Sequence, residues 1–168
     1  MKSSAVLKIW SATLGVVAAV LAPAASADQG WGINGTFRTS SNGAWAKLNE
    51  RYTDQPGLIS TWTITTQCVS PTECTGTVTS DQGWTAPIYT TNGIFYVKRV
   101  VPDWRFCDDG TPIEGLQTYH LYPVGPDGHL ADHSDEYAGE DHTIGASGSC
   151  GRNQWPVVRM PFYMKKIS

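Results

Sequence analysis

The stretch Thr61–Ser80, TWTITTQCVSPTECTGTVTS, alternates between two faces with a period of two residues. Every second residue from Trp62 to Cys68 lies on one face and includes the apolar ones, while threonine and glutamine occupy the other face. The same rule holds for Cys74–Val78. This alternation is typical of β-strands with one buried face. Folding the two halves together through residues 69–73 places Cys68 opposite Cys74, and the side chains of each facing pair then point to the same face of the sheet. The stretch therefore predicts an antiparallel hairpin.

The first 27 residues have the layout of a secretory leader. Lys2 and Lys8 are followed by an apolar run, Ile9–Leu21, and by Ala25–Ala27, a small-residue cleavage site. The apolar run is shorter than the roughly 20 residues that a membrane-spanning helix needs. We therefore expect a Sec signal peptide over residues 1–27 and a mature domain over 28–168, secreted to the cell envelope or the extracellular space, without an integral membrane span after cleavage.

Four cysteines occur in the chain. An even number of cysteines in an exported protein predicts disulfides rather than free thiols. Facing residues of an antiparallel ladder bring their Cβ atoms to about 4.5–5.5 Å. The hairpin therefore predicts a Cys68–Cys74 bridge, which leaves Cys107 to pair with Cys150. A zinc site is disfavoured because the spacing lacks the C-x2-C pattern.

The rest of the chain after the leader has turn signals at short intervals and no sustained helical periodicity. Such a pattern predicts an all-β fold. The expected domain is a single antiparallel barrel or sandwich of about eight to nine short strands with two disulfides, and the sequence does not choose between the two architectures. The strands include Gly35–Thr39, Trp45–Leu48 and Ile94–Val101, with a closing strand over Val157–Ile167 in which Pro161 predicts a bulge or an unpaired edge. Asn42–Gly43 and Asn92–Gly93 are expected as hairpin turns.

The charge balance restricts the partners. Without the leader, 10 basic residues remain against 15 acidic ones, about five negative charges in excess. The basic residues are dispersed, which excludes a nucleic-acid surface, and no basic amphipathic helix is present for binding a membrane surface.

Aromatic side chains are the first candidates for a binding site. Six tryptophans remain after cleavage, namely Trp31, Trp45, Trp62, Trp84, Trp104 and Trp155. Trp62 shares a strand face with Ile64, which favours a core position. Trp45 and Trp84 follow turns, where aromatic pairs stabilise sheets more often than they bind sugars. The sequence therefore leaves the ligand-binding residues unidentified.

The segment Pro126–His142 is rich in histidine and carboxylate. His129, His133 and His142 are its weak metal candidates, because imidazole is a common metal ligand. The lack of an apolar stripe favours a solvated acidic loop closed by the Cys107–Cys150 bridge. We expect no metal and no cofactor.

Catalytic motifs are not found in the sequence. Ser147 and Ser149 lie outside any G-x-S-x-G pattern, no H-E-x-x-H or phosphate loop occurs, and bridged cysteines offer no thiol nucleophile. No catalytic residue is predicted, and the protein is not expected to be an enzyme.

Several segments carry a resemblance to a known group of proteins. They are Trp62–Ser80, Gly83–Trp84, Cys107–Thr111 and Ser147–Cys150. Together they resemble uncharacterised small secreted two-disulfide β proteins of mycobacteria and related actinomycetes. The resemblance implies a scaffold outside the cytoplasm and no catalytic or binding residue.

These observations favour a non-catalytic binding or interaction module of the cell envelope or extracellular space. Its partner would be a protein or small ligand outside the cytoplasm. The alternatives are a carrier with a barrel cavity for a lipid or sugar, and a hydrolase without a recognisable motif.

Overall fold

The hairpin predicted from Thr61–Ser80 is present in the computed structural model, which describes residues 30–168. Strand β4 (Leu58–Ser70) pairs with β5 (Glu73–Ser80), and a disulfide joins the facing residues Cys68 and Cys74. A second disulfide joins Cys107 to Cys150. Both bridges are the predicted pairs. The predicted leader, residues 1–27, lies outside the described residues.

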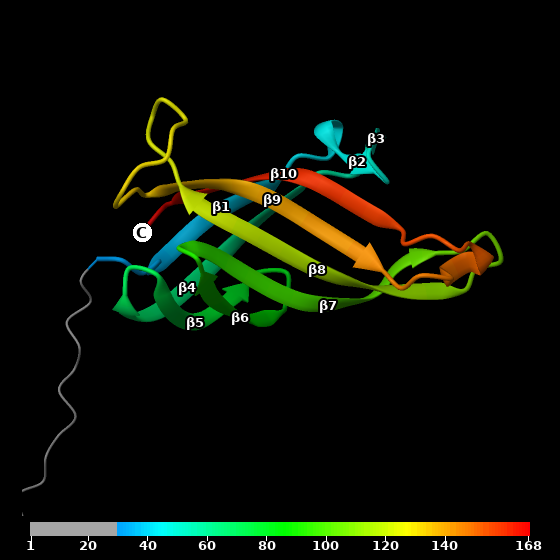
Figure 1. Cartoon of the computed structure of the whole chain (residues 1–168), viewed down its shortest axis with the longest axis horizontal. Helices are drawn as coiled ribbons and strands as arrows, with labels where there is room; N and C mark the ends of the chain where they lie inside the picture. Colours follow the sequence, from blue (N-terminus) through cyan, green and yellow to red (C-terminus); the bar gives the residue numbers. More distant parts are fainter. Residues whose placement is uncertain (1–29) are drawn as a thin grey trace, which may run out of the picture.

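The sheet closes on itself, which selects a barrel over a sandwich (Figure 1). The order β1-β4-β5-β6-β7-β8-β9-β10 is completed by pairing of β10 with β1, so eight antiparallel strands form the ring. Closure leaves no sheet edge within that ring. The remaining ring strands are β1 (Gly35–Ser41), β6 (Thr85–Thr91), β7 (Ile94–Phe106), β8 (Pro112–Pro123), β9 (Glu136–Gly145) and β10 (Val157–Lys166).

Two short strands extend the sheet outside the ring. Strand β2 (Lys47–Leu48) pairs with β10, and β3 (Arg51–Tyr52) pairs with β2. Two single-turn 3-10 helices, η1 (Gly43–Trp45) and η2 (Ser149–Gly151), precede β2 and β10 respectively. Residues 30–168 contain no helix with the length and apolarity needed to cross a bilayer.

Aromatic side chains fill the middle of the barrel. The ring centroid of Trp62 lies 4.8 Å from that of Tyr119 and 5.2 Å from that of Phe162. All three side chains are buried, and Trp84 covers them from one side. Burial of such large rings supplies much of the core energy of a small domain. The interior is therefore a packed core.

The expected hairpin turn at Asn42–Gly43 and the strand Trp45–Leu48 are wrong. Asn42 instead caps the 3-10 turn, its Oδ1 accepting a hydrogen bond from the amide of Ala44 at 3.2 Å, and only Lys47–Leu48 of the expected strand is paired in the sheet. The reason is topological: β1 takes β4 and β10 as neighbours, so no place beside it remains for the next segment.

The interpretation of residues 126–142 as one solvated loop is wrong in its second half. Strand β9 begins at Glu136 and lies between β8 and β10 in the ring. Its inward side chains include Tyr137 and Asp141, and Asp141 is only 1% exposed. A charged residue on the buried face conceals the period-two pattern from a reading of hydrophobicity alone.

Pro161 causes no bulge, since its pairing with Glu140 of β9 continues the register without a shift. The carbonyl of Pro161 accepts a hydrogen bond from Asn42 N at 2.9 Å. In a strand, the nitrogen and carbonyl of one residue point to the same neighbour, so the proline nitrogen, which has no hydrogen to donate, also faces Asn42, just after the end of β1. The residue thus occupies the unpaired gap between β1 and β2, and no ladder hydrogen bond is lost.

Candidate functional site

The strands β7, β8, β9 and β10 continue past the closed part of the barrel and form a curved extension, seen at the right of Figure 1. At its tip, the turn between β7 and β8 is joined to η2 by the Cys107–Cys150 disulfide. The bridge ties two segments separated by 43 residues and so holds the tip as one unit.

Trp104 covers the inner face of the extension. A Cβ atom on Gly115 would lie 2.7 Å from Trp104 Cδ2, and one on Gly145 would lie 3.2 Å from Trp104 Cζ3. Both glycines share the face that carries Gln117 and Asp141 farther along their strands. Without side chains on these glycines, the indole lies directly on the backbone and makes a rigid base.

The β2–β3 hairpin lies across from the disulfide-tied tip. Asn49 and Glu50 turn the chain with positive φ angles of 47° and 66°. The amide of Asn49 donates to the carbonyl of Val157 at 2.9 Å, and its side-chain Oδ1 accepts from the Val157 amide at 2.8 Å. Asparagine adopts positive φ at lower cost than most residues, and here the same residue attaches the hairpin to β10.

A groove of about 740 Å³ lies between this hairpin and the disulfide-tied tip. Its apolar lining includes Leu48, Ile113, Pro156 and Phe106, of which Phe106 is 64% exposed. The volume falls within the range usual for small-ligand sites, about 300–1,000 Å³. This groove is the candidate functional site.

Three arginines line the groove, each from a different segment: Arg51 of β3, Arg105 of β7 and Arg152 after η2. No ion pair formed within residues 30–168 involves any of them. The guanidinium of Arg105 lies 5.6 Å from the ring centroid of Trp104, which orients it without consuming its hydrogen bonds.

Two aspartates lie in the same lining, Asp108 and Asp109. The carboxylate of Asp109 accepts a hydrogen bond from the amide of Thr111 at 2.9 Å, and this bond lowers the pKa of Asp109 below its usual value. Asp109 therefore stabilises the turn. With three arginines and two aspartates, the groove keeps a formal charge of about one positive unit on a protein of negative net charge.

A buried polar network closes the barrel at the end nearer the extension. Asp141 accepts hydrogen bonds from Ser41 Oγ at 2.7 Å and from Gln117 Nε2 at 2.8 Å. Gln117 in turn accepts from Arg99 Nε at 2.8 Å, and the Arg99 guanidinium lies 4.6 Å from the centre of the Trp84 ring. Burial raises the pKa of Asp141, although these hydrogen bonds act in the opposite direction. The network satisfies the buried carboxylate and amide with hydrogen-bond partners.

The three candidate histidines do not come together. His129 and His133 lie in the exposed loop between β8 and β9, where His133 Nδ1 is 3.0 Å from the carbonyl of Gly30. His142 is half-buried on the outer face of β9, and burial lowers its pKa. Within the part of the chain that the structure describes, no group of three or more potential ligands is arranged to hold a metal.

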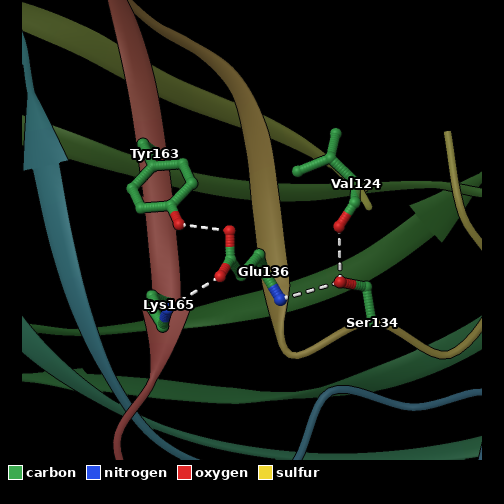
Figure 2. A network of polar contacts seen from close by, with 5 residues as sticks. All are labelled: Val124, Ser134, Glu136, Tyr163 and Lys165. Atoms are coloured by element: carbon green, nitrogen blue, oxygen red, sulfur yellow. Dashed lines mark hydrogen bonds and ion pairs between the residues drawn. The ribbon is translucent and has the colours of Figure 1, made fainter. Parts of the chain in front are cut away.

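The acidic residue Glu136, from the same segment, has a structural role (Figure 2). Its carboxylate accepts a hydrogen bond from Tyr163 Oη at 2.5 Å and pairs with Lys165 Nζ at 2.8 Å, which lowers the pKa of Glu136. Its amide donates to Ser134 Oγ, whose hydroxyl donates to the carbonyl of Val124. These contacts fix the start of β9 against β10, away from the groove.

The tryptophans fall into different environments. Trp62 is in the core as predicted, and Trp84 packs against it. Trp45 is 63% exposed and pairs edge-to-face with Tyr52 beside a smaller hollow of about 310 Å³ on the outer side of β10. Arg159 is paired with two carboxylates there, at 3.4 Å from Glu50 and 3.9 Å from Glu140.

The sequence analysis does not predict the arginine-lined groove, because the three arginines are far apart along the chain. One signal was available. Arg105 lies two residues before Cys107, and Arg152 lies two residues after Cys150, so the predicted bridge brings both arginines to one place. Arg51 has no such signal, because a two-residue strand positions it.

The fold and the disulfide-tied extension define the protein as a small antiparallel β-barrel domain with two disulfides. A solved structure described as the monomer form of the M. tuberculosis PknI sensor domain has a similar fold, with a TM-score of 0.56 and 20% sequence identity. The match covers 81% of this chain and 88% of that one. No protein-family model and no curated protein matches the sequence. At this identity the likeness shows a shared fold.

Proposed function

We propose that the protein is an extracytoplasmic binding or sensing domain without catalytic activity, and that its ligand binds in the groove between the β2–β3 hairpin and the Cys107–Cys150 tip. The observation that carries this proposal is the groove itself, whose walls are fixed by the disulfide and by Asn49 before any ligand arrives. Preorganised walls reduce the entropy cost of binding.

The composition of the groove favours binding over catalysis. Its lining contains no histidine, and the hydroxyl of Ser149 donates to the carbonyl of Ala146 at 2.6 Å. The remaining titratable groups are arginines, which stay protonated, and two neighbouring aspartates. The lining therefore offers no histidine base, and its one hydroxyl is directed to a backbone carbonyl, an arrangement that favours binding.

Two further lines of support concern the setting. Two disulfides suit an oxidising compartment, and a sensor domain shares the fold. A carrier that holds its ligand inside the barrel is disfavoured, because the aromatic core occupies that space. The predicted leader, residues 1–27, adds an export signal, and the predicted resemblance to secreted actinomycete proteins points the same way.

A fragment screen by ¹H–¹⁵N correlation spectroscopy tests the proposal. Pools of small polar and aromatic fragments should shift amides around Leu48–Arg51, Arg105–Asp109 and Ser149–Gln154. Replacing Ile113 by Trp fills the groove and should abolish these shifts, whereas Val69→Trp, at an exposed position near the end of β4 outside the groove, should preserve them. Fragments that collect instead beside Trp45, or that bind Ile113→Trp as well as the native protein, would contradict the proposed site.

A further inference from the structure

The arginines of this chain are unevenly distributed, and the imbalance centres on the groove. Six arginines occur in the sequence, and three of them line this one hollow, together with no lysine. Arg99 is committed to the Gln117 network, and Arg159 is committed to Glu50 and Glu140. The uncommitted guanidinium groups are therefore concentrated where the structure also provides a cavity.

Arginine differs from lysine in the ligands that it selects. Its planar guanidinium donates two parallel hydrogen bonds to a carboxylate or phosphate, and it loses less hydration on binding than an ammonium group. Three such groups around one hollow, from segments brought together by a disulfide and by a strand pairing, form a site for anionic oxygens.

The apolar residues of the groove add a second requirement. Leu48, Ile113 and Pro156 line the same hollow as the arginines, and Phe106 leaves 64% of its surface exposed there. An exposed phenylalanine beside a cavity favours a ligand that covers it with apolar surface. A small inorganic anion alone would leave this surface in water.

We infer that the groove binds an amphipathic anion, a molecule in which a phosphate or carboxylate group contacts Arg51, Arg105 and Arg152 while an adjoining apolar part covers Phe106 and Ile113. This inference rests on the proposed binding function and names its ligand class. The same chemistry occurs in a free metabolite and in a lipid headgroup with its first methylene groups.

Calorimetry and ¹H–¹⁵N spectra with octyl phosphate as the probe test the inference, with octyl glucoside as its neutral counterpart. Octyl phosphate should shift groove amides and bind at least tenfold more tightly than octyl glucoside. Each of Arg105→Ala and Arg152→Ala should weaken the binding of octyl phosphate about tenfold, the effect of one lost charge-assisted contact. The matched control is Arg38→Ala, which removes the same charge from an exposed position of β1 outside the groove and should leave the affinity unchanged.

The outcomes separate this inference from the proposed function. Equal binding of the two probes in the groove, or indifference to both arginine substitutions, would overturn the anionic ligand while leaving the groove a binding site. Failure of octyl phosphate to bind would overturn the inference even if neutral fragments occupy the groove. Absence of every probe from the groove would overturn both.

A sedimentation arm distinguishes the source of the anion. Sedimentation of the native protein with phosphatidylglycerol vesicles would support a lipid headgroup, provided that Arg105→Ala does not sediment with them and that the native protein does not sediment with vesicles of phosphatidylcholine alone. Binding of octyl phosphate without vesicle binding would support a soluble amphipathic anion.

Discussion

The Cys107–Cys150 bridge should be the larger contributor to stability through chain entropy. It closes a sequence separation of 43 residues, against 6 for Cys68–Cys74. In the loop-closure model these separations correspond to about 4 and about 2.4 kcal/mol of restricted unfolded-state entropy. Replacing Cys107 and Cys150 together by alanine should therefore lower the free energy of unfolding by about 4 kcal/mol, which lowers the melting temperature by roughly 15 °C in a domain of this size.

Packing complicates the comparison with the short bridge. Cys74 is 2% exposed and belongs to the core, so replacing Cys68 and Cys74 by alanine also removes buried sulfur, whereas Cys107 is only half-buried and Cys150 is exposed. Reduction keeps the sulfur atoms in place. Each double cysteine-to-alanine variant retains one bridge. The change in its free energy of unfolding when reductant is added, measured by urea unfolding, therefore reports the loop-closure entropy of that remaining bridge.

The expected result has two parts. The variant without Cys68 and Cys74 retains only the long bridge, and the variant without Cys107 and Cys150 retains only the short one. Reduction should therefore lower the free energy of unfolding of the first variant by about 1.6 kcal/mol more than that of the second, the difference between the two loop-closure energies. The urea m-value of the Cys107–Cys150 variant should exceed that of the native protein, because its unfolded chain expands and exposes more surface. A cost below about 1 kcal/mol for losing the long bridge, or an unchanged m-value, would refute the reasoning from unfolded-state entropy.

Asp141 of the buried polar network and Gly115 beneath Trp104 can be tested by substitution. Burial raises the folded-state pKa of Asp141 above its unfolded value, so its contribution to stability is present below the unfolded pKa and is lost as pH rises through the folded pKa. Asp141→Asn still bonds Gln117 and Ser41, so its stability relative to the native protein should increase from pH 4 to pH 8 in urea titrations; a pH-independent difference would exclude this account. Gly115→Ala should cost about 1–3 kcal/mol through overpacking against Thr143 and Trp104. The cost should fall in a background with both neighbours shortened, Trp104→Ala with Thr143→Ser, and an unchanged cost there would show that these two side chains are not responsible.

The strands were predictable where the buried face is apolar. Trp62, Ile64 and Val78 alternate cleanly, and their register fixes the Cys68–Cys74 bridge. The pattern fails where the barrel buries polar groups. Asp141 and Gln117 face inward because they satisfy one another and Ser41, and a hydrophobicity pattern carries no information about such partners.

The choice of barrel over sandwich depends on one long-range pairing. The alternation of apolar and polar residues over 157–166 predicts a strand, but this pattern does not indicate that the strand pairs with β1. Likewise, the groove depends on the two-residue pairing of β2 with β10 at Val158 and Leu48, which is too short to leave a periodic signal. Local patterns identify strands, and the order of the strands around the ring comes from packing of the whole chain.

The seam between β1 and β10 has a consequence for the timing of folding. It joins Phe37 to Lys166, and beside it the amide of Thr36 donates to the carbonyl of Ser168 at 2.8 Å. The ring is therefore incomplete until β10 takes its place, and a chain without β10 in position would have an unclosed sheet with two open edges. Because the two strands of this seam are far apart in the sequence, closure of the ring is a long-range step that we expect to come late in folding.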